Sequence, residues 1–187
     1  MRSAADSLRR RLGAILVDNA FRGAASAGRL HPLARPERHS VEVLRDIPYR
    51  REGGREHKLD IYRPTGRKGP LPIVLYVHGG GFRILSKNTH WIMALAFARR
   101  GYLVFTIDYR LAPRNPYPAA PEDAAAAFAW TVQNAERYGG DPARIFLAGE
   151  SAGANLITSL AIASSYERPE PWARVVFDLD VRPRAVL

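Results

Sequence analysis

The sequence predicts an α/β fold with a mainly parallel sheet and helices on both of its faces. The first observation is a set of short, nearly continuous apolar runs, which are typical of strands buried on both faces. The second is that segments with apolar residues at helical spacing separate these runs, as they do in α/β proteins. The third is that 187 residues, 47% of them hydrophobic, are enough for one domain with a packed core.

The composition narrows the classes of function. The chain has no cysteine, which excludes disulfides and a thiol nucleophile. Its net charge is +10, but the arginines are scattered along the chain, and Arg9–Arg11 is the one compact basic run. We therefore expect the basic residues to lie on solvated faces and in ion pairs, and we expect no nucleic-acid partner. Binding of a polyanion remains an alternative that a steep salt dependence of affinity would reveal.

Residues 1–40 are expected to form a helical N-terminal segment that ends near Pro32 and Pro36. Asp18 and Arg22 interrupt its apolar stretch, which favours an amphipathic helix over a signal peptide. No window reaches the apolar length of a membrane span, so no stable membrane insertion is expected. A cytoplasmic location is the default expectation.

The strands and helices expected from residue 41 onward follow the alternation described above. Two of the strands flank Glu52-Gly53-Gly54, which predicts a hairpin-like pair. The expected strands are 41–44, 58–62, 71–77, 102–107 and 144–148, and 183–187 opens another. Helical spacing predicts helices over 88–100 and 121–138, the second ending at Gly139-Gly140.

The first chemical motif is Gly149-Glu150-Ser151-Ala152-Gly153, which lies between an expected strand and an alanine-rich helical segment. A very tight strand-to-helix turn exposes the serine hydroxyl and needs glycines on either side of it. The helix that begins there directs amide hydrogens toward the same point. The motif predicts Ser151 as a nucleophile, and the alternative is an ordinary glycine-rich turn.

The second motif is His78-Gly79-Gly80-Gly81-Phe82, which directly follows the expected strand 71–77. Consecutive glycines allow a loop to fold around a developing oxyanion and donate backbone N–H groups to it. A phosphate-binding loop would instead need lysine and serine or threonine after the glycines, and Phe82-Arg83-Ile84 does not provide them. We interpret His78 as a structural residue that orders the loop.

Four motifs in order resemble the hormone-sensitive-lipase-like esterases of the α/β-hydrolase superfamily. They are HGGGF at 78–82, DYRLAP at 108–113, YPAAPEDAAAA at 117–127 and GESAGAN at 149–155. The resemblance covers 41–187 and implies that this range is the N-terminal part of a catalytic domain of the α/β-hydrolase fold. It also implies that 1–40 is part of a helical cap.

The resemblance implies a role for each matching residue. Ser151 is the expected nucleophile, and the amides of Gly80, Gly81 and Ala152 form the oxyanion hole, with Gly79 shaping the loop. Gly149 and Gly153 flank the serine turn, whereas Asp108 and Arg110 hold the connecting loop and do no chemistry. Glu150 stands where many members have aspartate. The implied reaction is hydrolysis of small carboxylic esters through an acyl-enzyme, without a metal or organic cofactor.

The resemblance implies a catalytic triad of a serine, an acid and a histidine, and this triad is incomplete in the chain. In α/β-hydrolases the acid and then the histidine follow the serine, but all five histidines precede Ser151. The late acids Asp178 and Asp180 are expected to be surface residues. We therefore expect the N-terminal part of an esterase that lacks the C-terminal strands of its sheet, with little or no turnover on its own. The alternative is a catalytically inactive binding module or gene remnant. The preferred acyl group and alcohol of the ester, and the oligomeric state, are left open.

Overall fold

A computed structural model describes residues 4–187, with side chains from Leu12 onward. Residues 1–3 of the predicted N-terminal segment, and the side chains of the basic run Arg9–Arg11, lie outside the described part. The strands are β1 (Val41–Pro48), β2 (Lys58–Pro64), β3 (Leu71–Val77), β4 (Leu103–Ile107) and β5 (Gly140–Gly149). The α-helices are α1 (Ala4–Leu30), α2 (Trp91–Ala98), α3 (Ala119–Asn134), α4 (Ala152–Ser165) and α5 (Pro171–Phe177). Short 3₁₀ helices cover Pro32–Ala34, Pro36–His39, Arg55–His57 and Ala135–Tyr138.

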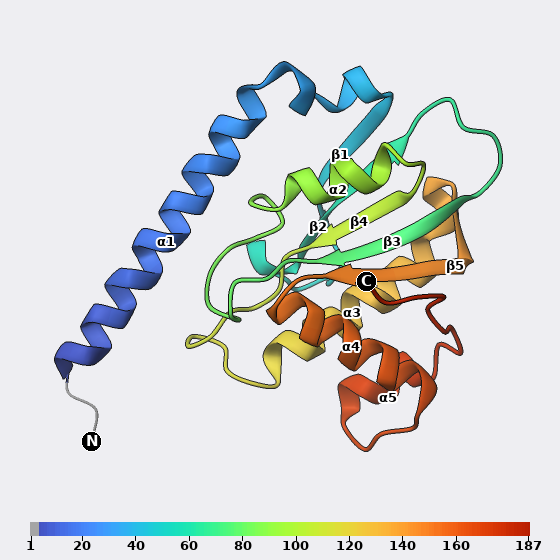
Figure 1. The fold of residues 1–187 in the computed structure, drawn as a ribbon. Coiled ribbons are helices and arrows are strands. Elements are labelled where there is room, and N and C mark those ends of the chain that lie inside the picture. Colours follow the sequence, from blue (N-terminus) through green and yellow to red (C-terminus); the bar gives the residue numbers. More distant parts are fainter. Residues whose placement is uncertain (1–3) are drawn as a thin grey trace.

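The five strands form one sheet in the order β1-β2-β4-β3-β5 (Figure 1). β4, β3 and β5 are parallel, which confirms the predicted parallel core of the sheet. β2 pairs antiparallel with both β1 and β4, so the predicted hairpin-like pair is present at one edge. Because parallel strands run in the same direction, the segments that follow β3, β4 and β5 all emerge at the same edge of the sheet.

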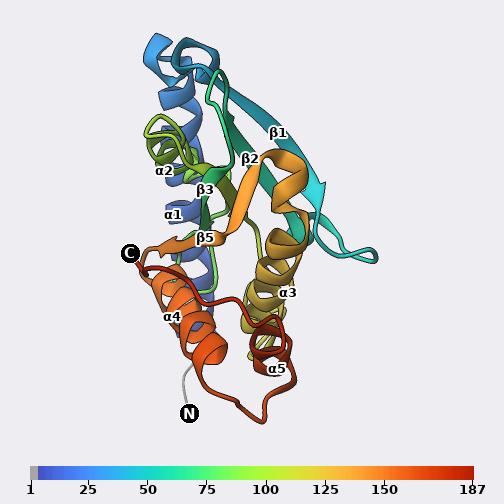
Figure 2. The same cartoon turned by 90° about the vertical axis from the view of Figure 1, so that its right-hand side faces the viewer.

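The sheet is covered on both faces, as the apolar runs predict (Figure 2). Successive residues of a strand point to opposite faces. Val74 and Tyr76 therefore pack toward α2, while Ile73 and Leu75 pack into the larger cluster that includes α3, α4 and α5. Double-sided burial explains why these strands are continuous apolar runs rather than alternating ones.

The predicted strand at 183–187 is present only as an isolated bridge between Leu147 and Val186. The segment nevertheless runs along the edge of β5, because Leu147 N donates to Ala185 O at 3.0 Å and Leu187 N donates to Leu147 O at 2.9 Å. The predicted helix 121–138 begins earlier, at Ala119, and its last turn is a 3₁₀ helix that ends at Gly139 with φ 85°.

Helix α1 projects along one side of the molecule rather than packing into its core (Figure 1). Its contacts with the body include Trp91, whose Nε1 donates to Ala25 O at 3.1 Å, and Asp18, whose carboxylate accepts from Leu85 N at 2.8 Å. Several large apolar side chains on the helix are exposed: Leu12, Ile15, Leu16, Val17 and Phe21. None of the helices that the structure describes has the length and apolar character of a membrane span.

Candidate active site

Ser151 occupies a strained turn between the end of β5 and the start of α4. Its backbone has φ 51° and ψ −116°, a region that residues other than glycine rarely adopt. Such a conformation costs about 1–3 kcal/mol and persists only where its surroundings enforce it. Gly153 N donates to Glu150 O at 2.8 Å, and Asn155 N donates to Ser151 O at 3.1 Å, so the first turn of α4 fixes the exposed serine.

At two positions of the serine turn there is no room for any side chain, so only glycine fits. A Cβ at Gly153 would lie 2.1 Å from Val77 O, and one at Gly149 would lie 2.9 Å from the same oxygen. Val77 is the last residue of β3, the strand that pairs with β5. The glycines therefore let the start of α4 approach the end of β3, where the glycine-rich loop begins.

The glycine-rich loop after β3 lies directly against the serine turn. A Cβ at Gly79 would be 2.9 Å from Glu150 O and 3.4 Å from Ser151 Cβ. Gly80 and Gly81 have φ 110° and φ 59°, so this loop uses backbone conformations that favour glycine. Among the described residues, neither amide donates to another protein group. The structure thus places the glycine-rich loop, which carries the two candidate oxyanion donors, against the turn of the predicted nucleophile.

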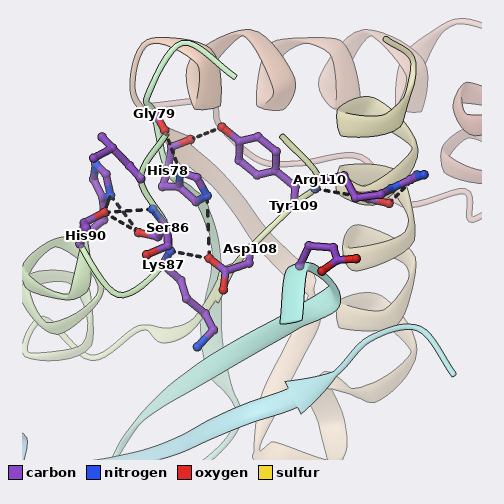
Figure 3. A network of polar contacts seen from close by, with 12 residues as sticks. His78, Gly79, Ser86, Lys87, His90, Asp108, Tyr109 and Arg110 are labelled. Carbon is purple, nitrogen blue, oxygen red and sulfur yellow. Dashed lines mark hydrogen bonds and ion pairs between the residues drawn. The ribbon is translucent and has the colours of Figure 1, made fainter. Parts of the chain in front are cut away.

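His78 orders the loop from beneath (Figure 3). Its ring is buried and stacked on Tyr109, with the ring centroids 4.4 Å apart. Nδ1 donates to Gly79 O at 2.7 Å, and the Tyr109 hydroxyl donates to His78 O at 2.9 Å. Burial lowers the pKa of His78 from 6.5 to about 3, so the imidazole is neutral at physiological pH. This geometry suits the structural role that the sequence predicts.

His90 links the loop region to the serine turn, and sequence reasoning missed it. Its Nε2 pairs with the Glu150 carboxylate, and its ring stacks on His78 with centroids 5.7 Å apart. Its Nδ1 lies 2.9 Å from Thr89 Oγ1 and 3.2 Å from Ser86 O. His90 precedes α2 and belongs to no recognisable motif. The one feature of the sequence that could have indicated the pair is Glu150, an acid next to Ser151.

Asp108 and Lys87 join the loop after β4 to the segment after the glycines (Figure 3). Lys87 N donates to Asp108 Oδ1 at 2.7 Å, and burial raises the pKa of Asp108 to about 6. The Lys87 ammonium is buried and donates to Asp60 at 2.7 Å and to Asp46 at 2.9 Å. The sequence did not single out Lys87, because a buried lysine with carboxylate partners from distant strands leaves no local pattern.

Arg110 anchors the loop after β4 to helix α3. Its Nε donates to Asp123 Oδ2 at 2.8 Å and one terminal nitrogen donates to Asp123 Oδ1 at 2.9 Å, while Glu122 accepts a further bond at 2.8 Å. Asp123 is fully buried and also contacts His57 Nε2 at 3.0 Å. In the sequence, Asp123 stands out only as part of the motif at 117–127. In the structure, the Asp123 carboxylate is buried and is paired with Arg110 and His57.

None of the three buried histidines contacts Ser151. His57 bonds Asp123, His78 bonds Gly79, and His90 bonds Glu150 and Ser86. Asp178 and Asp180 follow α5 and lie away from the buried core, as expected of surface residues. Within the described part of the chain, no group of three or more histidine or carboxylate side chains is placed to hold a metal ion.

The comparisons with known proteins agree with this geometry. A family model described as alpha/beta hydrolase fold matches residues 74–178, more than half of the chain. The chain is similar to carboxylesterase NlhH of Mycobacterium tuberculosis, with 41% identity over 71% of this chain and 39% of NlhH. It is also similar to the solved esterase LipW of Mycobacterium marinum, with 36% identity, a TM-score of 0.66, and coverage of 89% of this chain and 50% of LipW.

A third similar structure is the esterase of the archaeon Pyrobaculum calidifontis, with 33% identity, a TM-score of 0.61, and coverage of 81% of this chain and 46% of that one. The chain thus spans between 39% and 50% of the length of these three proteins. The strained serine, the glycine-rich loop packed against it and the family match together identify the chain as a member of the α/β-hydrolase fold family, among the hormone-sensitive-lipase-like esterases.

Proposed function

We propose that this chain carries the nucleophile and the oxyanion hole of a serine carboxylesterase. The observation that supports this most directly is the Ser151 backbone at φ 51°, with Gly79 of the glycine-rich loop so near that a Cβ added to it would lie 3.4 Å from Ser151 Cβ. Ser151 Oγ attacks the ester carbonyl, the alcohol leaves, and an acyl-enzyme forms that water then hydrolyses. The relatives named above are carboxylesterases and esterases, which favours this reaction over other acyl transfers.

The oxyanion formed in this attack is assigned to the amides of Gly80, Gly81 and Ala152. Oriented N–H groups stabilise a developing negative charge without having to reorganise, and loss of one such donor typically costs about 10²–10³ in rate. Gly79 keeps the loop against the serine turn, and neutral His78 holds the Gly79 carbonyl, so the loop remains oriented. Asp108 and Arg110 support the neighbouring loop through Lys87 and Asp123 and take no part in the chemistry.

A serine hydroxyl needs a base to remove its proton. All five histidines of this chain are engaged with groups other than Ser151, His31 and His39 with the Leu33 backbone, so the proposal requires a histidine from outside these 187 residues. With p-nitrophenyl butyrate at pH 9, the chain alone is expected to release at most one equivalent of p-nitrophenol per protein, slowly, and then stop.

The control for this burst is Ser151→Ala, which should release only the background amount. If release were the same in both proteins, Ser151 would not be the nucleophile. If release continued through many turnovers and depended on Ser151, the base would lie within the chain, and the requirement for an external histidine would be wrong.

A further inference from the structure

A pocket of about 530 Å³ lies between helix α1, the β1–β2 loop (residues 49–57) and the loop after β4. Leu85 and Asn88, which follow the glycine-rich loop, also line it. Its lining contains no residue of the glycine-rich loop or of the serine turn, both of which the structure describes, so the pocket is separate from the place where an ester carbonyl would lie. The volume is within the range of about 300–1,000 Å³ that is usual for small-molecule sites.

The pocket is rich in basic side chains, which come from α1, from the end of the β1–β2 loop and from the loop after β4. They are Arg22, Arg55, Lys58, Arg110 and Arg114. Two of the five already have carboxylate partners, because Arg22 pairs with Asp18 at 2.6 Å and Arg110 pairs with Asp123 at 2.8 Å. The other three form no ion pair with any side chain that the structure describes.

The acidic side chains of the pocket do not balance these three cations. Asp46, Glu56 and Asp108 line the pocket. Lys87 already binds two of them, because its ammonium donates to Asp46 at 2.9 Å and its backbone N–H donates to Asp108 at 2.7 Å. Among the described residues, Glu56 is therefore the one acid left to face Arg55, Lys58 and Arg114.

The surroundings of these cations favour a bound anion. Leu85 and Tyr109, which are buried, form part of the lining. A concave surface with low-dielectric walls and charges mainly of one sign concentrates the electric field and attracts ions of the opposite sign. Guanidinium and ammonium groups bind the oxygens of phosphates and carboxylates through charge-assisted hydrogen bonds. An anion in the pocket would thus offset positive charge that no described side chain offsets.

We propose that this pocket binds a small anion that carries two or more negative charges on phosphate or carboxylate groups, held by Arg55, Lys58 and Arg114. More than one negative charge is expected because the three cations come from two separate segments, the end of the β1–β2 loop with the start of β2 and the loop after β4. The inference does not depend on the chemistry of Ser151.

Inorganic pyrophosphate and citrate are the two probes, each titrated into the ¹⁵N-labelled chain at pH 7.5 in about 0.15 M NaCl, which screens general attraction between exposed charges. We expect saturable shifts of the backbone amides of Ser86, Asn88 and Asn115, which line the pocket. Saturation by pyrophosphate alone assigns a phosphate ligand, and saturation by citrate alone assigns a carboxylate ligand. If neither probe saturates these shifts by about 10 mM, the proposal is wrong.

Arg55→Gln and Arg51→Gln form a matched pair of variants. Both arginines are exposed in the β1–β2 loop, but only Arg55 lines the pocket. Each substitution removes one positive charge, so a general attraction to a chain of net charge +10 would weaken equally in both. A pocket predicts that Arg55→Gln and Arg114→Gln each weaken binding at least about fivefold, while Arg51→Gln changes affinity by less than about twofold. Equal effects at 51 and 55 would overturn the proposal.

A second matched pair tests the opposite sign. Glu56→Gln removes the carboxylate that competes with the ligand for the cations, so it should strengthen binding by about twofold or more. Glu52 is exposed in the same loop but does not line the pocket, so Glu52→Gln should leave affinity nearly unchanged. Weaker binding in Glu56→Gln, or equal gains in both variants, would contradict the assignment. Unchanged amide signals outside residues 49–58 show that each variant is folded.

Ser151→Ala separates this proposal from the proposed catalytic function. Ser151 does not line the pocket, so this variant should bind the anion with unchanged affinity. Anion binding that is lost in Arg55→Gln but kept in Ser151→Ala supports the pocket even if the burst with p-nitrophenyl butyrate is absent. A normal burst in a chain that binds neither probe leaves the nucleophile in place and contradicts the anion site.

Discussion

The two glycine-rich turns at the edge of the sheet use glycine for different physical reasons. In the serine turn after β5, Gly149 and Gly153 are required because the carbonyl of Val77 leaves no room for a side chain. In the loop after β3, Gly81 has free space around it and is required by its positive φ alone, whereas Gly80 meets both constraints. One turn is therefore fixed by its contacts with β3, and the other by the conformations that its own backbone adopts.

This difference has a functional consequence. The serine must be held in a strained conformation, which needs rigid neighbours on all sides. The oxyanion loop must present successive N–H groups to one point, which needs unusual dihedral angles. Gly79 belongs to the loop by sequence but is constrained like the serine turn, because its Cβ would meet Glu150 and Ser151. Gly79 is therefore the position at which the glycine-rich loop packs against the serine turn.

The largest effect is expected for Gly153→Ala. Its Cβ would lie 2.1 Å from the Val77 carbonyl oxygen, and neither backbone is free to move without breaking the pairing of β3 and β5. We expect a loss of about 3 kcal/mol or more in the free energy of unfolding, measured by urea denaturation. Gly23→Ala in α1, which has open space around it, should instead stabilise the chain by about 0.5–1 kcal/mol. Equal effects of the two variants would contradict the steric account.

The next effect is the pH dependence that His78 introduces. Its pKa is about 3 in the folded chain, against about 6.5 when unfolded, so only the unfolded state binds this proton between these values. The free energy of unfolding should therefore fall as the pH drops below about 6.5, by about 1.4 kcal/mol per pH unit from this group. His78→Gln should flatten the slope between pH 6.5 and 5. A slope unchanged by the substitution would show that the imidazole is not held neutral.

A smaller effect is expected for Gly81→Ala. The new Cβ meets no neighbour, so only the positive φ of 59° opposes it, and the free energy of unfolding should fall by about 1–2 kcal/mol. By urea denaturation followed with circular dichroism, Gly81→Ala should unfold at a higher urea concentration than Gly153→Ala. If Gly81→Ala were as damaging as Gly153→Ala, the loop would be fixed by packing, and the distinction between the two turns would be lost.

The smallest effect is expected for the pair of His90 and Glu150, which connects the two turns. Glu150 has a side-chain exposure of 51%, so solvent screens the interaction, and we expect a coupling energy of about 0.5–1 kcal/mol. A double-mutant cycle with His90→Gln, Glu150→Gln and the double variant measures it. Strict additivity of the two single substitutions would show that the pair does not hold the turns together.

The features that could be predicted from the sequence are those encoded locally. Continuous apolar runs identified β3, β4 and β5, and the glycines around Ser151 and after His78 identified both turns before their proximity was known. What could not be predicted depends on contacts between distant segments. Lys87 with Asp60, Asp123 with Arg110 and His90 with Glu150 each join residues from different elements, and none of these pairs leaves a periodic or adjacent pattern. The run at 183–187 was predicted as a strand but forms only a single bridge beside β5.

The measurement that tests the central claim most directly compares two serines of one helix region. Ser151 and Ser165 are both exposed and lie at opposite ends of α4, but only Ser151 has the glycine-rich loop beside it. The chain is treated with p-nitrophenyl butyrate at pH 9, and butyrylation of each serine is followed by peptide mass spectrometry. An oxyanion hole predicts acylation of Ser151 that is faster by about 10² or more. Equal rates at the two serines would contradict the assignment of these turns as a nucleophile and its oxyanion hole.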